Sequence, residues 1–363
     1  MKSEKWKVKR INYTKQPTTN DQRPTTNDQQ PITNINNLYE TKYHSEDLSN
    51  YSFLVTGGAG FIGSNLTNYL LKYGAKKVRV LDNLATGSLD NFSDFKDHPA
   101  FEFMEGDIRD IETCKEAMEG IDYVSHQAAL GSVPRSINDP ATSNAVNVSG
   151  FLNILIAQKD SPSVKRLVYA ASSSTYGDSA SLPKIEDKIG KPLSPYAVTK
   201  LVNELYADVF YKTYGSETIG FRYFNVFGPK QSPTGAYAAV IPLFMQALVD
   251  NEAPTMNGDG EQTRDFTYVE NAVQANVRGM FAPKEAVNEV FNVAFGERIS
   301  LNTLWDSLQK TSGKKLDAKF GPDRRGDVRD SLANIDKARK LMRYDPLFSV
   351  EDGLKITWEY FTA

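Results

Sequence analysis

The chain has 363 residues, 40% of which are hydrophobic, and its formal net charge is -3 with a pI near 5.8. This length and apolar content are enough for one large domain or two moderate ones with a buried core, so a small disulfide-stapled protein and a coiled coil are excluded. The small net charge gives no electrostatic footprint for nucleic acid or an anionic membrane.

The first 50 residues are predicted to be a disordered, low-complexity tail. Residues 16–34 read QPTTNDQRPTTNDQQPITN, a polar repeat of seven residues with proline at 17, 24 and 31. Such a repeat can bury almost nothing to offset the loss of chain entropy. A tether or docking segment and a dispensable extension both stay open. We expect residues 1–45 to be removable without loss of activity, and the folded part to begin near Ser52.

From Ser52 onward, short apolar runs alternate with amphipathic stretches of helical length. This alternation predicts an α/β fold with a Rossmann-type, doubly wound parallel sheet covered by helices on both faces. The expected strands are Phe53–Thr56, Val78–Asp82, Phe101–Gly106, Tyr123–Gln127, Leu167–Ser172 and Thr218–Tyr223. The expected helices are Gly60–Tyr73, Ile111–Met118, Thr142–Lys159 and Pro195–Tyr214.

The alternation weakens after about residue 230, where proline, glycine and charged residues become frequent. Residues 51–230 are therefore predicted to form a first, Rossmann-type domain, to which the motifs described next assign cofactor binding and catalysis. Residues 231–363 are predicted to form mainly a smaller substrate-binding lobe, with some segments able to return to the first domain.

A glycine-rich segment, Gly57–Gly63, directly follows the first expected strand. Glycines at such a turn let the backbone approach a pyrophosphate, and the N-terminus of the next helix supplies free N–H groups and a partial positive charge. The second strand ends at Asp82, whose carboxylate can accept hydrogen bonds from an adenosine ribose. A carboxylate there disfavours the 2′-phosphate of NADP, so the sequence predicts NAD.

Tyr196 and Lys200 lie one turn apart in the helix that Pro195 begins, so both can point at one substrate atom. A tyrosine with a pKa near ~10 is a poor base, but an adjacent ammonium and the positive nicotinamide ring favour the phenolate. The strand before this helix ends in a serine run that starts at Ser172. A lone YxxxK pattern is common by chance, and serine clusters are usually solvated turns. Their order after a dinucleotide-binding pattern nevertheless makes these three residues the catalytic candidates.

Cysteine and histidine give no further site. The single Cys114 cannot form an intramolecular disulfide, and the three scattered histidines lack metal-ligand spacing. No stretch approaches ~20 apolar residues, and no apolar segment of a signal peptide follows the basic start. We expect a cytoplasmic protein without a bound metal, a membrane association or a nucleic-acid partner.

These residues resemble the extended short-chain dehydrogenases, from about Ser52 to the C-terminus. The matching strings are TGGAGFIG, the Asp82-Asn83 strand end, SSS followed by YG, YAVTK and RYFN. More narrowly, HQAALGSVPRSINDP, YAASSSTYGD, KPLSPYAVTK, RYFNVFG, GAYAAVIP and NGDG are similar to bacterial UDP-N-acetylglucosamine 4-epimerases. That family supplies UDP-N-acetylgalactosamine, or its uronic acid counterpart, for surface polysaccharides such as O-antigen.

The resemblance implies reversible epimerisation at C4 through a 4-keto intermediate and transient NADH, in a homodimer. Tyr196 would act as the base toward the 4-hydroxyl, Ser172 would hydrogen-bond that oxygen, and Lys200 would hold the nicotinamide ribose. The strand ends and the resemblance together give the cofactor positions Gly57, Gly60, Phe61, Ile62, Gly63, Asp82, Asn83, Gly87, Asp107, Ile108, Gln127, Ala128, Ala129, Tyr196, Lys200 and Tyr223.

The substrate positions implied by the same matching are Gly131, Ser132, Ser172, Ser173, Tyr196, Asn225, Gln231, Ala239, Val240, Asn257, Arg264, Arg324, Asp327 and Ser331. The guanidiniums of Arg264 and Arg324 suit an anionic diphosphate. Ser331 occupies a position that a bulky tyrosine holds in relatives restricted to unacetylated sugars, so its small side chain leaves room for an N-acetyl group. One departure is Arg325, where close relatives tend to carry an acid.

Several alternatives stay open. A UDP-glucose/UDP-galactose or a UDP-uronate 4-epimerase would share the catalytic group and differ only in the sugar contacts. A sugar-nucleotide 4,6-dehydratase or decarboxylase is disfavoured, because the run Ser172–Thr175 lacks the Asp-Glu pair usual in dehydratases. A non-catalytic NAD(H)-binding regulator would have no need for all three catalytic candidates.

Overall fold

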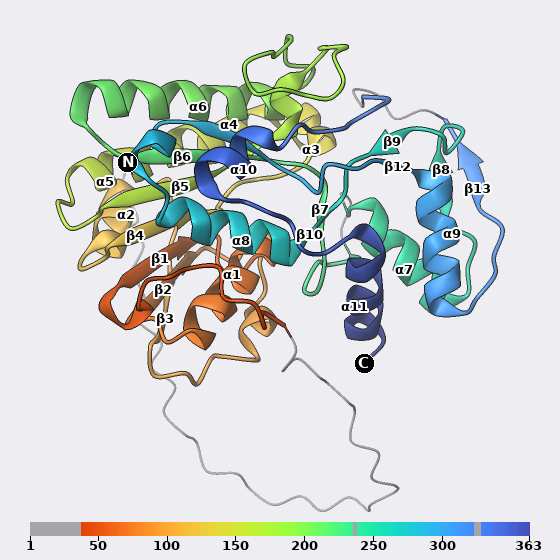
Figure 1. Cartoon of the computed structure of the whole chain (residues 1–363), viewed down its shortest axis with the longest axis horizontal. Helices are drawn as coiled ribbons and strands as arrows, with labels where there is room; N and C mark the ends of the chain where they lie inside the picture. Colours follow the sequence, from red (N-terminus) through yellow and green to blue (C-terminus); the bar gives the residue numbers. More distant parts are fainter. Residues whose placement is uncertain (1–37, 235–237, 323–327) are drawn as a thin grey trace, which may run out of the picture.

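A seven-stranded sheet lies at the centre of the computed structural model, which describes residues 38–234, 238–322 and 328–363 (Figure 1). Its order is β11-β6-β5-β4-β1-β2-β3, and every neighbouring pair is parallel. The strands are β1 (Ser52–Thr56), β2 (Lys77–Asp82), β3 (Phe101–Glu105), β4 (Tyr123–His126), β5 (Arg166–Ser172), β6 (Thr218–Tyr223) and β11 (Val290–Val293). The predicted fold class is confirmed.

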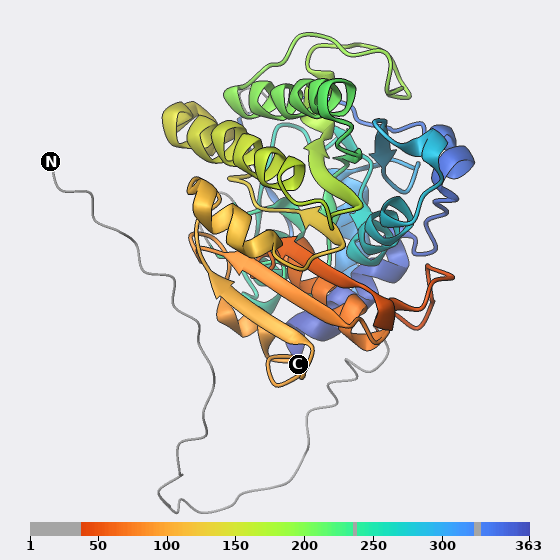
Figure 2. The same ribbon diagram turned by 90° about the vertical axis from the view of Figure 1, so that its left-hand side faces the viewer.

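Helices cover both faces of this sheet, as Figure 2 shows. Successive side chains of a strand point to opposite faces, and in β1 Phe53 packs into the same core as α1 (Phe61–Lys72) and α8 (Val269–Met280). Leu54 instead packs with α2 (Ile111–Met118), α5 (Phe151–Lys159) and α6 (Pro195–Tyr214). Burial on both faces explains why the strands are continuous apolar runs.

The helix α6, which presents Tyr196 and Lys200, has the predicted bounds because its ends are encoded locally. The side chain of Ser194 accepts a hydrogen bond of 3.2 Å from the backbone N–H of Ala197, and Pro195 takes the first position. Gly215 ends the helix in the left-handed conformation, with φ of 73°.

The single helix predicted over residues 142–159 is wrong in detail. It is divided into α4 (Pro140–Asn144), a π-helical segment (Ala145–Gly150) and α5. Inside the π-helical segment, the side chain of Asn147 accepts from Leu130 N (2.8 Å) and donates to Leu130 O (3.1 Å). The wider π-helical turn thus places the side-chain amide of Asn147 against the loop that contains Leu130. A helical pattern in the sequence does not show where such a wider turn occurs.

Residues after 230 contribute to two different cores. The strand β11 and the helix α8 belong to the central sheet layer. The helices α7 (Val240–Asp250), α9 (Leu301–Ser312) and α11 (Val350–Thr362) instead enclose a second core around Phe244, Leu304 and Trp305. The other α-helices and strands of the described residues are α3 (Val133–Asn138), α10 (Asp336–Met342), β7 (Val226–Phe227), β8 (Thr255–Asn257), β9 (Thr263–Arg264), β10 (Thr267–Tyr268), β12 (Ile299–Ser300) and β13 (Lys319–Gly321). In the described part of the chain, no helix is both long and apolar enough to cross a bilayer.

The prediction of a disordered tail over residues 1–50 is wrong for Leu38–Asn50, which we call the N-terminal strap; residues 1–37 lie outside the described ranges. Tyr39, Tyr43 and Leu48 of the strap are at most 2% exposed. The ring of Tyr43 stacks on Tyr69 at 5.5 Å, and its hydroxyl donates to Glu270 Oε1 at 2.7 Å. The first 50 residues are polar on average, and these few aromatic side chains do not change that average. Their contacts with α1 and α8 form only when the protein folds.

Deletion of residues 1–45, which the sequence predicts to leave activity intact, is therefore expected to destabilise the protein. Losing the buried rings of Tyr39 and Tyr43 should lower the free energy of unfolding by ~5 kcal/mol or more. A control truncation that begins at Leu38 keeps all of these contacts and should unfold like the full chain. Thermal denaturation of the three proteins checks this, and equal melting temperatures would show that the strap contributes nothing.

Candidate active site

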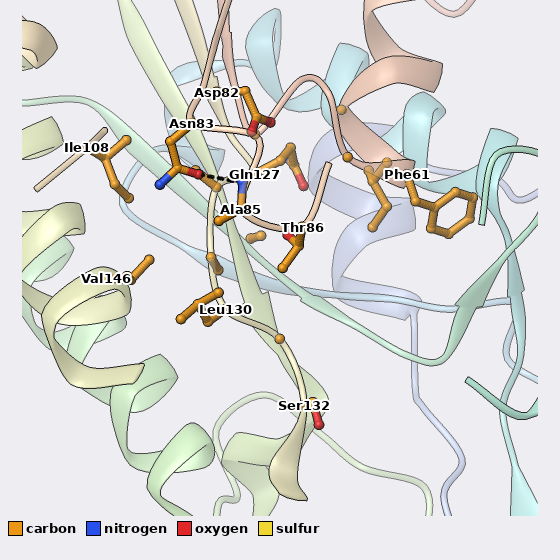
Figure 3. Close-up of a pocket in the computed structure, with 18 of the residues that line it drawn as sticks. Phe61, Asp82, Asn83, Ala85, Thr86, Ile108, Gln127, Leu130, Ser132 and Val146 are labelled. Atoms are coloured by element: carbon orange, nitrogen blue, oxygen red, sulfur yellow. Dashed lines mark hydrogen bonds between the residues drawn. The ribbon is translucent and has the colours of Figure 1, made fainter. Parts of the chain in front are cut away.

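A cavity of about 580 Å³ opens at the carboxyl ends of the central strands (Figure 3). Its lining includes Asp82 from the end of β2, Ser172 from the end of β5 and Tyr223 from the end of β6. In Figure 3, Asp82 and Asn83 lie toward one end of the cavity and Ser132 toward the other. Ligands of doubly wound sheets bind at this edge.

The glycine-rich turn between β1 and α1 forms one wall of the cavity. Gly57 has φ of 69°, and a Cβ atom there would lie 2.6 Å from the backbone N of Ala128. A Cβ atom on Gly63 would lie 2.3 Å from the carbonyl oxygen of Gly57. Because Gly60 caps α1 without a side chain, the first N–H groups of the helix can face a diphosphate. This turn therefore fits the predicted dinucleotide.

Asp82 is held rigidly at the far end of the same wall. Its carboxylate accepts backbone hydrogen bonds from Ala59 N (3.0 Å) and Leu84 N (2.8 Å). Burial raises the pKa of this carboxyl, and the backbone hydrogen bonds oppose that rise. A carboxylate so fixed beside the glycine-rich turn fits an adenosine ribose, as NAD requires.

A cluster at the ends of β2 and β3 extends this wall. Asn83 Nδ2 donates to Asp107 Oδ2 at 2.9 Å, and Arg109 pairs with the same carboxylate at 2.7 Å. Burial would raise the pKa of Asp107, but the hydrogen bonds from Arg109 and Asn83 hold it below its usual value. Arg109 lines the cavity and was missed, although it directly follows the predicted positions Asp107 and Ile108.

A buried polar network fixes Gln127 and Tyr223 in the floor of the cavity. Gln127 Nε2 donates to Asn276 Oδ1 at 3.0 Å and to the hydroxyl of Tyr223 at 3.3 Å. Asn276 Nδ2 donates to the same hydroxyl at 2.7 Å. Asn276 belongs to α8, about 150 residues from Gln127 in the chain. Sequence patterns gave no sign that it supports the site.

The three catalytic candidates line this one cavity. Ser172 ends β5, and its Oγ accepts a hydrogen bond of 3.2 Å from Ser174 N. The backbone N–H of Tyr196 donates to Ser136 Oγ at 3.0 Å, which fixes the first turn of α6. Lys200 Nζ donates to Ala170 O at 2.7 Å, so its ammonium is held against the same strand that carries Ser172.

Burial is the main influence on the pKa values of this group. It raises the pKa of Tyr196, while the hydrogen bond with Ser172 opposes the rise. It lowers the pKa of Lys200 to about 8, against the attraction of Glu204. Lys200 is therefore mostly charged at neutral pH, while Tyr196 keeps its proton until a further positive group enters the cavity. The positively charged nicotinamide ring of NAD would be such a group.

Turnover is expected to fall as the pH rises through about 8, because Lys200 then loses the charge that favours a Tyr196 phenolate. A profile of kcat against pH checks this. In Lys200→Arg the residual activity should lack the descending limb near pH 8, since a guanidinium stays charged there. A wild-type profile that stays flat well above pH 9 would contradict the assignment.

Two further cavities adjoin the first, and Asn225 lines all three. The larger, of about 520 Å³, is lined mainly by residues of α7 and of the segment Glu252–Asn257 that follows it. The smaller, of about 170 Å³, contains Ser173, Arg264 and Ser331. Lys184, which was not among the predicted positions, also lines it. The predicted residues Arg324 and Asp327 lie outside the described ranges.

Asp265 joins the segments that form the smaller cavity, a role that sequence reasoning missed. Its fully buried carboxylate accepts hydrogen bonds from Ala333 N (3.1 Å) and Gly296 N (3.2 Å). Burial raises its pKa to about 7. Ser331 N also donates to Thr263 O at 3.1 Å. The segment around Ser331 is thus bonded to both neighbours of Arg264, Thr263 and Asp265.

The structure brings nearly all predicted positions to these three cavities. On the large cavity lie Gly57, Gly60, Phe61, Ile62, Gly63, Asp82, Asn83, Asp107, Ile108, Gln127, Ala128, Ala129, Gly131, Ser132, Ser172, Tyr196, Lys200, Tyr223, Asn225 and Gln231. Ser173 and Ser331 line the smallest, Ala239, Val240 and Asn257 line the third, and Arg264 lines both of these. Gly87 is not among the lining residues; it follows Thr86, which lines the large cavity, and a Cβ atom on it would lie 2.8 Å from the backbone C of Ala59. Within the described residues, no group of three or more His, Cys, Asp or Glu side chains could hold a metal ion.

Comparison with known proteins agrees with this geometry. The model of the NAD dependent epimerase/dehydratase family matches residues 53–294. The chain is 33% identical to UDP-glucose 4-epimerase of Mycolicibacterium smegmatis over 310 residues, 85% of this chain and 97% of that protein. It is 35% identical to UDP-glucuronate 4-epimerase of Thermodesulfobacterium geofontis over 314 residues, 84% of this chain and 94% of that protein. A solved UDP-N-acetylglucosamine 4-epimerase from Methanobrevibacter ruminantium, in complex with UDP-N-acetylmuramic acid, is similar with a TM-score of 0.82 and 35% identity, covering 86% of this chain and 98% of that one.

Proposed function

Because the chain belongs to the NAD dependent epimerase/dehydratase family, whose cofactor is NAD, we propose that it interconverts UDP-N-acetylglucosamine and UDP-N-acetylgalactosamine by inverting C4. The named relatives support NAD-dependent 4-epimerisation of a UDP-sugar. That the sugar carries an N-acetyl group is our proposal. The observation that carries it is the small side chain of Ser331 beside Ser173 in the 170 Å³ cavity.

The chemistry of this chain would proceed through its own three catalytic residues. When bound, NAD supplies reversible hydride transfer at C4 of the sugar. Tyr196 would remove the proton of the 4-hydroxyl, and Ser172 would hydrogen-bond the same oxygen. The charge of Lys200 would favour the phenolate that Tyr196 must become. Inversion then needs the 4-keto sugar to present its other face, so Tyr196 must return the proton with the sugar in a second orientation.

The cavities beside the catalytic residues offer room for the sugar to bind in two orientations. Asn225 lines the 580 Å³ cavity and also the 520 Å³ and 170 Å³ cavities, so the three volumes meet at one side chain. Its amide is fixed, because Nδ2 donates to Asp265 O at 3.0 Å. A hexose attached to a diphosphate at this junction would have volume on two sides, which a turning sugar needs.

A UDP-uronate 4-epimerase is the second candidate, and Lys184 is the observation that favours it. Lys184 lines the 170 Å³ cavity and is 5% exposed, and burial lowers its pKa. A cation there could pair with the carboxylate of a uronic acid. A 4,6-dehydratase stays disfavoured by the absence of an acid in the run Ser172–Thr175.

The deciding experiment is a panel of four substrates, UDP-N-acetylglucosamine, UDP-glucose, UDP-glucuronate and UDP-N-acetylglucosaminuronate, with C4 inversion followed by proton NMR. We expect UDP-N-acetylglucosamine to have the highest kcat/KM. The proposal fails if purified protein supplied with NAD inverts no acetylated sugar. A preference for UDP-glucuronate would favour the uronate alternative instead.

We also propose that the protein is a homodimer that pairs through α6. The apolar side chains Val198, Leu205 and Val209 of this helix lie on one face and are 49%, 59% and 52% exposed. Apolar exposure on one helix face is typical of an interface. Leu205→Asp is expected to shift the sedimentation coefficient from dimer to monomer. A wild-type protein that sediments as a monomer at micromolar concentration would contradict this assignment.

A further inference from the structure

The N-terminal strap is linked to the nucleotide-binding part of the molecule through Asn65 of α1, which is 1% exposed. The hydroxyl of Tyr39 donates to Asn65 Oδ1. On its other side, Asn65 Nδ2 donates to Phe61 O at 2.8 Å and to Pro229 O at 3.0 Å. One buried amide thus connects the strap with the loop Gly228–Gln231.

Tyr39 has a fixed orientation. Its φ is 63°, in the left-handed region that side-chain-bearing residues rarely adopt. The carbonyl of Tyr39 accepts a hydrogen bond of 2.9 Å from the hydroxyl of Tyr73, and its ring meets Tyr69 edge-to-face at 5.8 Å. Such a backbone persists only where the surroundings hold it. The strap therefore presents this hydroxyl to Asn65 in one position.

The loop that receives this support carries Gln231 into the substrate site. Gln231 lines both the 580 Å³ and the 520 Å³ cavities. One residue earlier, Lys230 has φ of 70° and is anchored to Asp94 at 2.7 Å and to Asn91 O at 2.8 Å. The loop is thus strained at Lys230 and held on both sides, by Lys230 itself and by the contact of Pro229 with Asn65.

We propose that Tyr39 is a positioning residue for substrate binding, which acts through Asn65 to hold the Gly228–Gln231 loop with Gln231 at the junction of the two cavities. The inference rests on the proposed function, because it takes a UDP-sugar as the occupant of that junction. The match to the family model begins at residue 53, after the strap. Tyr39 thus brings support from outside the matched segment.

The test compares full-length Tyr39→Phe with full-length Tyr43→Phe. Each variant removes one buried hydroxyl of the strap, but the hydroxyl of Tyr43 bonds Glu270 and not Asn65. Tyr39→Phe is expected to bind UDP about fivefold more weakly by titration calorimetry, and to show a matching rise in KM with kcat within about twofold. Tyr43→Phe should lose thermal stability and bind UDP like the wild type. Both should retain bound NAD.

A second variant, Asn65→Leu, tests the other half of the connection. It has a similar volume but no amide for Pro229, so it is expected to weaken UDP binding at least as much as Tyr39→Phe. The double variant should be no weaker than Asn65→Leu alone, because both changes interrupt one connection.

Any of the following results would overturn the inference: wild-type UDP affinity in Tyr39→Phe, an equal loss of affinity in Tyr43→Phe, or additive losses in the double variant. Loss of NAD together with UDP affinity would show that Tyr39 only supports folding, and would also overturn it. A wild-type protein that binds no UDP at all would instead count against the proposed function.

Discussion

Tyr196→Phe is expected to lower kcat by about 10³-fold while leaving NAD bound. The change removes one oxygen from a residue whose backbone is held by Ser136 and whose side chain lies with Ser172 and Lys200 on the large cavity. A positioned general acid–base group typically contributes about 10²- to 10⁴-fold to the rate. Single-turnover formation of the 4-keto sugar should fall by the same factor.

A matched control is Tyr211→Phe, on the same helix but away from the three cavities. It should retain wild-type turnover. Bound NAD is measured in each variant by absorbance after denaturation. Activity near the wild-type level in Tyr196→Phe would remove the basis of the proposed chemistry. An inactive wild type that still holds NAD would favour the non-catalytic regulator.

Ser331→Tyr is expected to lower kcat/KM for UDP-N-acetylglucosamine about 30-fold relative to UDP-glucose. Ser331 is 6% exposed in a cavity of about 170 Å³, so a phenol ring there would fill the volume proposed for the acetyl group. Its main chain is fixed by the bond from Ser331 N to Thr263 O at 3.1 Å, which limits how far the segment can move aside.

Ser331→Ala is the companion variant, because it removes the hydroxyl and keeps the space. It should retain the preference for the acetylated sugar, which would separate the effect of volume from that of hydrogen bonding. An equal loss of activity on acetylated and plain sugars in Ser331→Tyr would show that the residue does not select the sugar.

Local sequence was enough for the cofactor wall. The turn Gly57–Gly63 and the strand end at Asp82 are encoded within about 30 residues, because a tight turn needs glycine and a buried parallel strand needs a continuous apolar run. The bounds of α6 were predictable for the same reason, since Ser194 and Gly215 act on their immediate neighbours. The spacing of Tyr196 and Lys200 followed from that helix.

Residues that support the site from a distance were not predictable. Asn276 reaches Gln127 across about 150 residues, and Asp265 joins Gly296 and Ala333 through its carboxylate. An isolated asparagine or aspartate in a sequence is most often solvated, and nothing local separates these two from the rest. Gly87, which the resemblance placed on the cofactor, packs against Ala59 of the glycine-rich turn, and its contact with the cofactor stays a prediction.

By itself, the sequence predicted the α/β class and six of the seven central strands, because apolar runs and helical periods are patterns of residues near in the chain. The roles of Ser172, Tyr196 and Lys200 stay a prediction. Only the tertiary structure decided that β11 completes the sheet, that residues 145–150 are π-helical and that Leu38–Asn50 belongs to the core. The hydrogen bond from Tyr43 to Glu270 joins residues that lie 227 positions apart in the chain. The periodic pattern of apolar residues carries no information about a contact over that separation. Such contacts form only when the folded chain brings both partners out of water together.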